Sequence, residues 1–190
     1  MKKLELRNHI IKVASDLFYS KGYNATGINE IIENAHIAKA TLYNHFKSKE
    51  ELCIEYLKDM NSKFMQELAL FIETQDNVRL KLLGIFDYLR ELYRASNFNG
   101  CWACKCISEI GKENKTIREE IQHQKNNLLQ FLKDLVQKNI PQNSNAESER
   151  LSNAIYLLYE SAISESYLHQ NDWPIYSAKS IANQMITNNN

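Results

Sequence analysis

The 190-residue chain contains only five glycines and two prolines. Their scarcity argues against sandwiches and barrels, which need many tight turns, and favours long uninterrupted helices. No apolar run approaches the roughly 18 residues that a membrane-spanning helix requires. The basic amino-terminal segment MKKLELRNHI also lacks the apolar stretch of a signal peptide. The sequence therefore predicts a soluble cytoplasmic protein that does not associate with a membrane.

The chain also lacks a net charge, because 23 basic residues balance 23 acidic ones. The two signs are not evenly distributed. Residues 1–49 contain eight Lys or Arg and four Asp or Glu, and the remainder carries a net charge of −4. A small basic end next to an acidic remainder indicates that this end binds a polyanion. A chance fluctuation would give the same asymmetry. Charge alone therefore does not establish that this end binds a polyanion, and the sequence motifs are needed as well.

Apolar residues recur at helical spacing along the chain and do not alternate convincingly with the period of a strand. We predict an all-α protein of about nine helices, in which three short amino-terminal helices precede an antiparallel bundle of about six longer ones. Gly22 marks the end of the first helix. Capping boxes at Ser48–Glu51 and Thr116–Glu119 mark the starts of the fourth and seventh helices.

Residues 36–52, HIAKATLYNHFKSKEEL, contain the third helix, which buries only a narrow side formed by Leu42 and Phe46. The rest of the helix combines small side chains with polar ones. These residues are Ala38, Lys39, Ala40, Thr41, Tyr43, Asn44 and His45. Small side chains let a helix backbone approach bases, and polar ones reach phosphates and base edges. The pattern predicts a helix-turn-helix unit that enters a DNA major groove; the alternative is an ordinary three-helix core with a solvated surface.

The segments LFYSKGYNATGINEII and AKATLYNHFKSKEEL resemble the DNA-binding domain of the tetracycline-repressor (TetR) family of bacterial transcription regulators. The resemblance is strong over residues 5–55, and beyond residue 75 it rests on helix number, helix length and the Asn-Gly-Cys that opens the sixth helix. It implies a helix-turn-helix domain at 1–50 and a ligand-binding and dimerisation domain at 51–190. It also implies a homodimer that binds a double-stranded DNA operator and releases it when an unknown small-molecule inducer binds.

Matched position by position, the resemblance implies particular DNA contacts. Tyr43, His45 and Lys49 correspond to phosphate contacts, and Thr26 and Gly27 to the start of the second helix, which grips the DNA backbone. The groove-facing positions correspond to Lys39, Ala40, Thr41 and Asn44.

Two residues depart from the family pattern. His36 stands where the turn usually has glycine, at a position that often needs a positive φ. Ala38 stands where a Ser or Thr usually caps the recognition helix, a loss of about 1 kcal/mol. Neither departure changes the assignment.

The eighth helix has apolar residues on two sides, one including Ile155 and the other Ile163. A helix of this kind is buried on both sides. We expect one side to face the chain's own bundle and the other a partner, with Ile155 and Ile163 as interface positions in a dimer formed by helices eight and nine. A monomer with a large core is the alternative. Aromatic residues that are candidates for ligand contact, or else plain core, are Tyr93, Phe98, Trp102, Tyr156 and Tyr159.

Four cysteines occur, Cys53, Cys101, Cys104 and Cys106. Cytosolic thiols stay reduced, and on a helix Cys106 points away from Cys101 and Cys104, so we expect no metal and no cofactor. No spacing of nucleophile and base supports an enzyme. We therefore predict a ligand-responsive repressor in which the cysteines pack as small apolar residues. The alternatives are a repressor that senses oxidants or electrophiles through Cys101, Cys104 and Cys106, and a DNA-binding protein without a small-molecule ligand.

Overall fold

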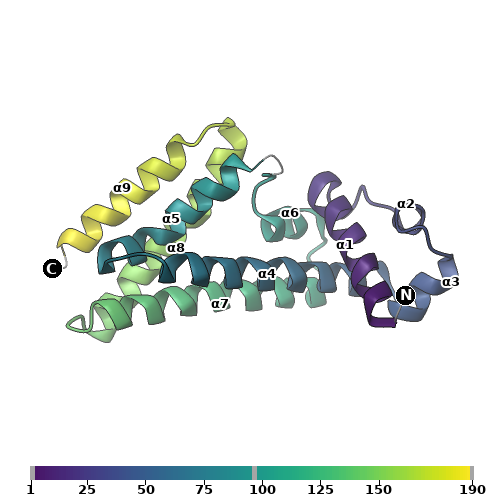
Figure 1. Cartoon of the computed structure of the whole chain (residues 1–190), viewed down its shortest axis with the longest axis horizontal. Coiled ribbons are helices and arrows are strands. Elements are labelled where there is room, and N and C mark those ends of the chain that lie inside the picture. The colour runs from purple at the N-terminus through teal and green to yellow at the C-terminus, as the bar shows by residue number, and fades with distance from the viewer. Residues whose placement is uncertain (1–2, 96–97, 189–190) are drawn as a thin grey trace. The chain divides into compact units, whose positions relative to one another are not determined.

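The computed structural model of the protein describes residues 3–95 and 98–188. Over these residues the chain forms nine α-helices and no strand (Figure 1). The helices are α1 (Lys3–Lys21), α2 (Ile28–Asn34), α3 (Lys39–His45), α4 (Lys49–Glu73), α5 (Val78–Arg94), α6 (Trp102–Glu109), α7 (Lys115–Asn139), α8 (Asn145–His169) and α9 (Trp173–Asn188). The predicted all-α class is confirmed. None of the helices in these ranges is long and apolar enough to cross a membrane.

The chain divides into two compact units by packing. The first unit comprises residues 1–63 and 101–123, and the second comprises 64–100 and 124–190. The helices α4 and α7 each contribute residues to both units. The functional boundary predicted between residues 50 and 51 is a different division, which packing does not test, and it stays a prediction.

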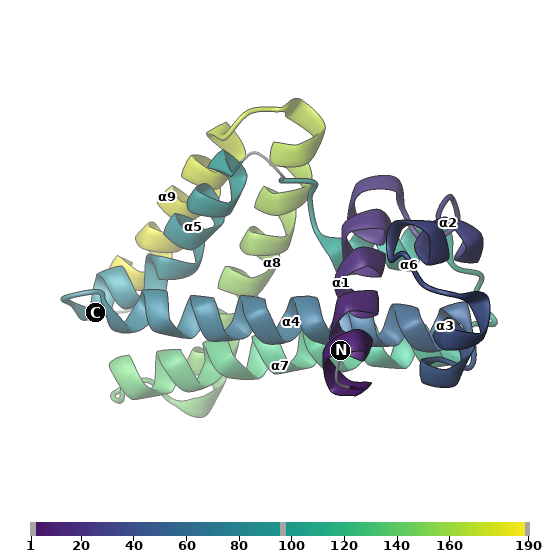
Figure 2. The same cartoon turned by 45° about the vertical axis from the view of Figure 1, so that its right-hand side comes forward.

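The first unit is organised around the short helices α2 and α3. Helix α1 packs against α2 and α2 against α3, and Figure 2 shows the three together near the amino terminus. Their shared core is aliphatic and aromatic. It includes Ile10, Phe18, Ile31, Leu42, Phe46, Leu52 and Tyr56, all of them buried. Helices of seven residues are not stable alone in water, so this core is what holds α2 and α3 in place.

The turn between α2 and α3 adopts the backbone that the sequence predicts. His36 has a φ of 52°, in the left-handed region. Ala38 precedes α3 without a side-chain cap. The start of α4 is also as predicted, because the Glu51 N–H donates to Ser48 Oγ at 3.0 Å. The orientation of α3 is therefore set by a left-handed turn on one side and a capped helix start on the other.

The predicted capping box at Thr116–Glu119 is wrong. Helix α7 begins at Lys115, so Thr116 lies inside its first turn. The cap is Asn114, whose side-chain oxygen accepts the Ile117 N–H at 3.1 Å. Asparagine caps a helix at least as well as threonine. Because Asn114 precedes Thr116, a helix capped by Asn114 begins before Thr116 and includes it. A complete capping box does occur between Ser144 and Glu147, at the start of α8.

The second unit packs α8 against α9, and α5 against both (Figure 1). Ile155 and Ile163 of α8 are 1% and 3% exposed within the single chain. The expectation that these two residues form a subunit interface is therefore wrong, because the chain's own bundle covers them. The apolar residues that remain exposed on α8 and α9 are different ones. They are Leu157, Tyr167, Leu168, Trp173, Tyr176 and Ile181.

Candidate nucleic-acid interface

Helix α3 has one buried side and one exposed side. Leu42 and the following Phe46 are fully buried. Lys39, Ala40, Tyr43 and Asn44 are exposed, and their spacing of one and four residues places them on one side of a helix. We call these four residues the recognition face. The structure thus brings together four of the residues that the sequence predicts for DNA contact, and Thr41 and His45 are half-buried at the edges of this face.

The end of α3 is fixed by residues from α1 and α4. The Phe46 N–H donates to the Leu42 carbonyl at 2.9 Å. The Arg7 guanidinium lies 5.1 Å from the centre of the Phe46 ring and bonds to the Glu55 carboxylate at 2.5 Å. Burial opposes ionisation of Glu55, but the hydrogen bonds and positive charges of Arg7 and Lys58 together outweigh it and lower the pKa of this carboxyl. Arg7 was not among the predicted site residues, because its partners are distant in sequence.

Thr26 and Gly27 lie just before α2 and differ in exposure. Thr26 is fully buried, and its hydroxyl donates to the Gly22 carbonyl at 2.7 Å. Gly27 is exposed and stands at the N-cap of α2. The Thr26 side chain therefore supports the turn from inside, and of the two residues only Gly27 presents its backbone at the surface.

Lys49 begins α4 and is half-buried. Its ammonium lies 4.3 Å from the centre of the Tyr23 ring, as a cation–π contact. Burial lowers the pKa of Lys49 and raises that of Tyr23 to about 12. A phosphate contact by Lys49 would require the ammonium to leave this ring. Lys47, in contrast, is exposed.

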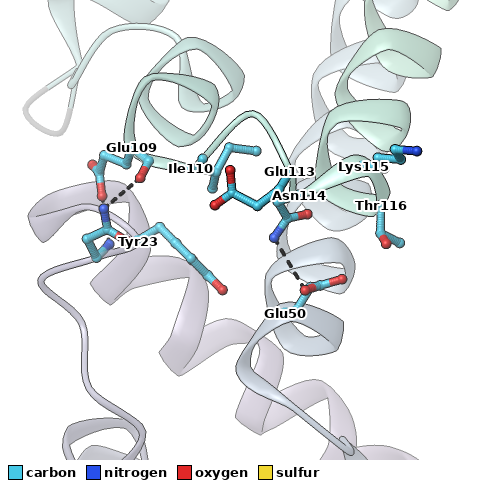
Figure 3. Close-up of a pocket in the computed structure, with 10 residues that line it drawn as sticks. Tyr23, Glu50, Glu109, Ile110, Glu113, Asn114, Lys115 and Thr116 are labelled. Atoms are coloured by element: carbon cyan, nitrogen blue, oxygen red, sulfur yellow. Dashed lines mark hydrogen bonds between the residues drawn. The ribbon is translucent and has the colours of Figure 1, made fainter.

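Helix α6 bonds to α1 and to the turn between α1 and α2. The Asn24 N–H donates to Glu109 Oε2 at 2.7 Å, and the Asn24 side-chain amide donates to the Glu109 carbonyl at 2.6 Å. Lys105 Nζ donates to the Tyr19 carbonyl at 2.8 Å. Glu109 and Asn114 line a hollow of about 430 Å³, and Figure 3 shows both side chains among the residues around it. No sequence signal indicated these bonds, since Asn24 and Glu109 are 85 residues apart.

Replacing Gly22 by Ala tests the contact between α6 and this turn. Gly22 has a φ of 97°, and an added Cβ would overlap the Glu109 carboxylate. We expect a loss of about 1–3 kcal/mol in the free energy of unfolding, with a smaller loss when Glu109 is also changed to Ala. Chemical denaturation measures both. Gly27→Ala is the control, because Gly27 has a φ of −87° and open space around it; a loss as large as that of Gly22→Ala would contradict the argument.

The predicted ligand residues are distributed over both units. Trp102 belongs to the first unit, and the others belong to the second. The Tyr93 and Phe98 rings meet edge-on at 5.2 Å, whereas Tyr159 is buried 6.2 Å from the Phe64 ring. A hollow of about 300 Å³ between α5 and α9 is lined by other residues. The ligand contacts of Tyr93, Phe98, Trp102, Tyr156 and Tyr159 remain predictions.

The structure turns Cys106 away from Cys101 and Cys104, which lie together, as helical geometry predicts. Cys101 Sγ accepts the Cys104 N–H at 3.5 Å. Cys106 instead faces Cys53 of α4, with the two Sγ atoms 3.6 Å apart. All four cysteines are free thiols. The sequence reasoning missed Cys53 as a partner, since the two positions are 53 residues apart.

Comparisons with known proteins agree with this geometry. The family of bacterial regulatory proteins, tetR family, matches residues 10–56. The chain is 41% identical over 64 residues to the HTH-type transcriptional regulator QacR of Staphylococcus aureus, which covers 34% of each chain. It is 31% identical over 80 residues to the HTH-type transcriptional repressor KstR2 of Mycolicibacterium smegmatis, which covers 42% of this chain and 39% of the relative. The matched region is thus well under half the length of these relatives.

Solved structures match the whole fold at low sequence identity. The reduced form of NemR from Escherichia coli superposes with a TM-score of 0.85 at 17% identity, covering 94% of this chain and 95% of that one. A TetR transcriptional regulator from Chloroflexus aurantiacus gives a TM-score of 0.85 at 22% identity, covering 98% and 96%. The sequence match covers the helix-turn-helix region. The solved structures share the fold of the whole described chain, with its nine helices. The helix-turn-helix region of the chain, residues 10–56, belongs to the tetR family of bacterial regulatory proteins.

Proposed function

We propose that the protein is a DNA-binding transcriptional regulator, a repressor that leaves its operator when a small molecule binds to the second unit. The observation that carries the DNA-binding part is the recognition face of α3. Two fully buried apolar residues anchor the helix, and the exposed side presents Lys39, Ala40, Tyr43 and Asn44. Small and polar side chains on a rigidly held helix suit major-groove entry. The relatives include transcriptional regulators and repressors, and also the transcriptional activator FasR of Mycolicibacterium smegmatis.

The repressor is proposed to act as a homodimer through α8 and α9. Leu157 and Leu168 of α8 are 65% and 71% exposed, and Ile181 of α9 is 48% exposed. Between the two leucines, the same side of α8 carries Ser161 and Ser164, which are also exposed. Small residues between exposed leucines allow close approach of another helix. A second copy of the chain would bury this surface and hold two recognition faces for a palindromic operator.

Two substitutions separate base contacts from phosphate contacts. An operator selected from random duplex DNA serves as ligand, and fluorescence anisotropy measures affinity over a range of salt concentrations. Asn44→Ala should reduce discrimination at one base pair by about 1–3 kcal/mol. Lys47→Ala should weaken binding to all sequences and reduce the salt slope by about 1. Both residues are exposed at or beside the recognition face.

The control is Lys138→Ala, which removes an exposed lysine from α7 in the second unit. Its salt slope and affinity should equal those of the unaltered protein. If Asn44→Ala and Lys47→Ala behaved like this control, the proposed interface would be in the wrong place.

Sensing by cysteine is the second candidate for release of the operator. The sequence left it open as the alternative to cysteines that only pack, through Cys101, Cys104 or Cys106. The observation that favours it concerns Cys106 alone, whose sulfur faces Cys53 rather than the other two.

A further inference from the structure

Two buried cysteines face each other in the first unit. Cys53 lies in the first turns of α4 and Cys106 near the end of α6, and they are 0% and 3% exposed. Their Sγ atoms are 3.6 Å apart. A disulfide has an S–S distance of about 2.05 Å, so an approach of about 1.5 Å would join them. We call Cys53 and Cys106 the thiol pair.

The two thiols differ in their readiness to ionise. The hydrogen bond between the two sulfurs lowers the pKa of Cys106. The same bond, together with burial, raises the pKa of Cys53. The thiolate therefore forms first at Cys106, beside a thiol that can react with its oxidised form. A reactive thiolate next to a resolving cysteine is the usual arrangement of a redox-sensitive site.

We propose that the thiol pair is a reversible redox site, which a peroxide converts into a disulfide between α4 and α6. Both sulfurs are buried, which favours a small neutral oxidant over a bulky or charged electrophile. A thiol reductant restores the reduced pair. Such transient disulfides are the kind that occur in reducing compartments.

The chemistry balances with a peroxide as the only oxidant. The Cys106 thiolate attacks a peroxide oxygen, so that an S–O bond forms, the O–O bond breaks and the departing hydroxide takes up a proton to become water. Cys53 then loses its proton and attacks the Cys106 sulfenic acid. The S–S bond forms, the S–O bond breaks and a second hydroxide leaves and becomes water. Two thiols lose two electrons in total, and one hydrogen peroxide is reduced to two waters.

The position of the thiol pair connects it to the recognition face. Cys53 is four residues after Lys49, where α4 begins, directly after α3. Cys106 is three residues before Glu109, which bonds to Asn24 in the turn that leads to α2. Drawing the sulfurs together therefore displaces the supports of α2 and α3. This consequence rests on the proposed function. Oxidation should lower operator affinity by roughly 5- to 150-fold, the usual size of coupling between two sites.

The test uses the full-length protein, hydrogen peroxide and peptide mass spectrometry. After treatment, the protein is unfolded in iodoacetamide and digested, and the disulfide is located by its linked peptides. The unaltered chain should give the Cys53–Cys106 link, and dithiothreitol should remove it. Cys53→Ala and Cys106→Ala should each abolish the link. The matched control replaces Cys101 and Cys104 by Ala and should keep it.

Operator affinity is measured on the same samples. It should fall on oxidation in the unaltered chain and in the Cys101/Cys104 control, and stay constant in Cys53→Ala and Cys106→Ala. Cys→Ser versions and thermal unfolding check that the alanine variants remain folded. If Cys53 and Cys106 stay alkylatable after peroxide, or link to other cysteines, the redox site is refuted. A link that forms without changing affinity would refute its coupling to DNA. Absence of DNA binding by the reduced protein would refute the proposed function, and the linked peptides would still decide the redox site.

Discussion

Phe46→Ala should cost the first unit about 3–5 kcal/mol in its free energy of unfolding, the usual loss for a fully buried phenylalanine. Phe46 is 0% exposed, and its ring lies under the Arg7 guanidinium. The substitution leaves a cavity at the end of α3 and removes the partner of Arg7. Because α3 has only seven residues and depends on the core for its stability, the recognition face should lose its fixed orientation. DNA binding should be lost with it.

Tyr43→Ala is the matched aromatic control, since Tyr43 lies in α3 itself, three residues before Phe46. Tyr43 is 44% exposed, so its removal should change stability by less than about 0.5 kcal/mol. It should still weaken DNA binding, since Tyr43 belongs to the recognition face. Hydrogen exchange of the α3 amides reports stability in this unit, and anisotropy reports affinity. Equal loss of protection in the two variants would mean that the helix is not anchored through Phe46.

The helix-turn-helix region was predictable because its signals are local. Two apolar residues four apart define the buried side of α3, and Ser48 with Glu51 defines the start of the next helix. His36 takes the left-handed backbone that its place in the turn requires. Each of these signals lies within a few residues of the structure it determines, so propensity and spacing were enough.

Contacts between distant residues were not predictable in the same way. Helical spacing indicated that Cys106 points away from Cys101 and Cys104, but nothing in the sequence placed Cys53 opposite it. The bonds between Asn24 and Glu109 are equally non-local. Such pairs depend on how α6 packs beside α4 and the turn after α1, and periodicity within one helix carries no information about its neighbours.

The eighth helix illustrates the same limit. Apolar residues on two sides correctly indicated burial on two sides, since Ile155 and Ile163 are both buried. The pattern did not reveal that neighbours in the same chain cover both sides. The exposed side was harder to recognise, because Leu157 and Leu168 are separated along it by serines. A sparse line of leucines gives a weak periodic signal, although the structure makes its exposure plain.

Leu157→Glu should convert the proposed dimer into monomers. Leu157 is 65% exposed in the single chain, so the substitution should leave the folded monomer intact. In a two-fold symmetric interface the change occurs twice, and each carboxylate would be buried without a partner. A cost of about 3 kcal/mol corresponds to a loss of dimer affinity on the order of 100-fold. Sedimentation velocity at micromolar concentration measures the dimer, and operator affinity should fall because only one recognition face engages at a time.

Leu70→Glu provides the matched control for this prediction. Leu70 is also 65% exposed, but it lies on α4 rather than on α8 or α9. It should sediment as a dimer and bind the operator normally.

Ile155→Glu should give a third outcome. Ile155 is buried in the chain's own bundle, so a glutamate there should unfold the second unit rather than release folded monomers. If Leu157→Glu remained a dimer while Leu70→Glu dissociated, the subunit interface would lie on α4 and the proposed pairing of α8 and α9 would be incorrect.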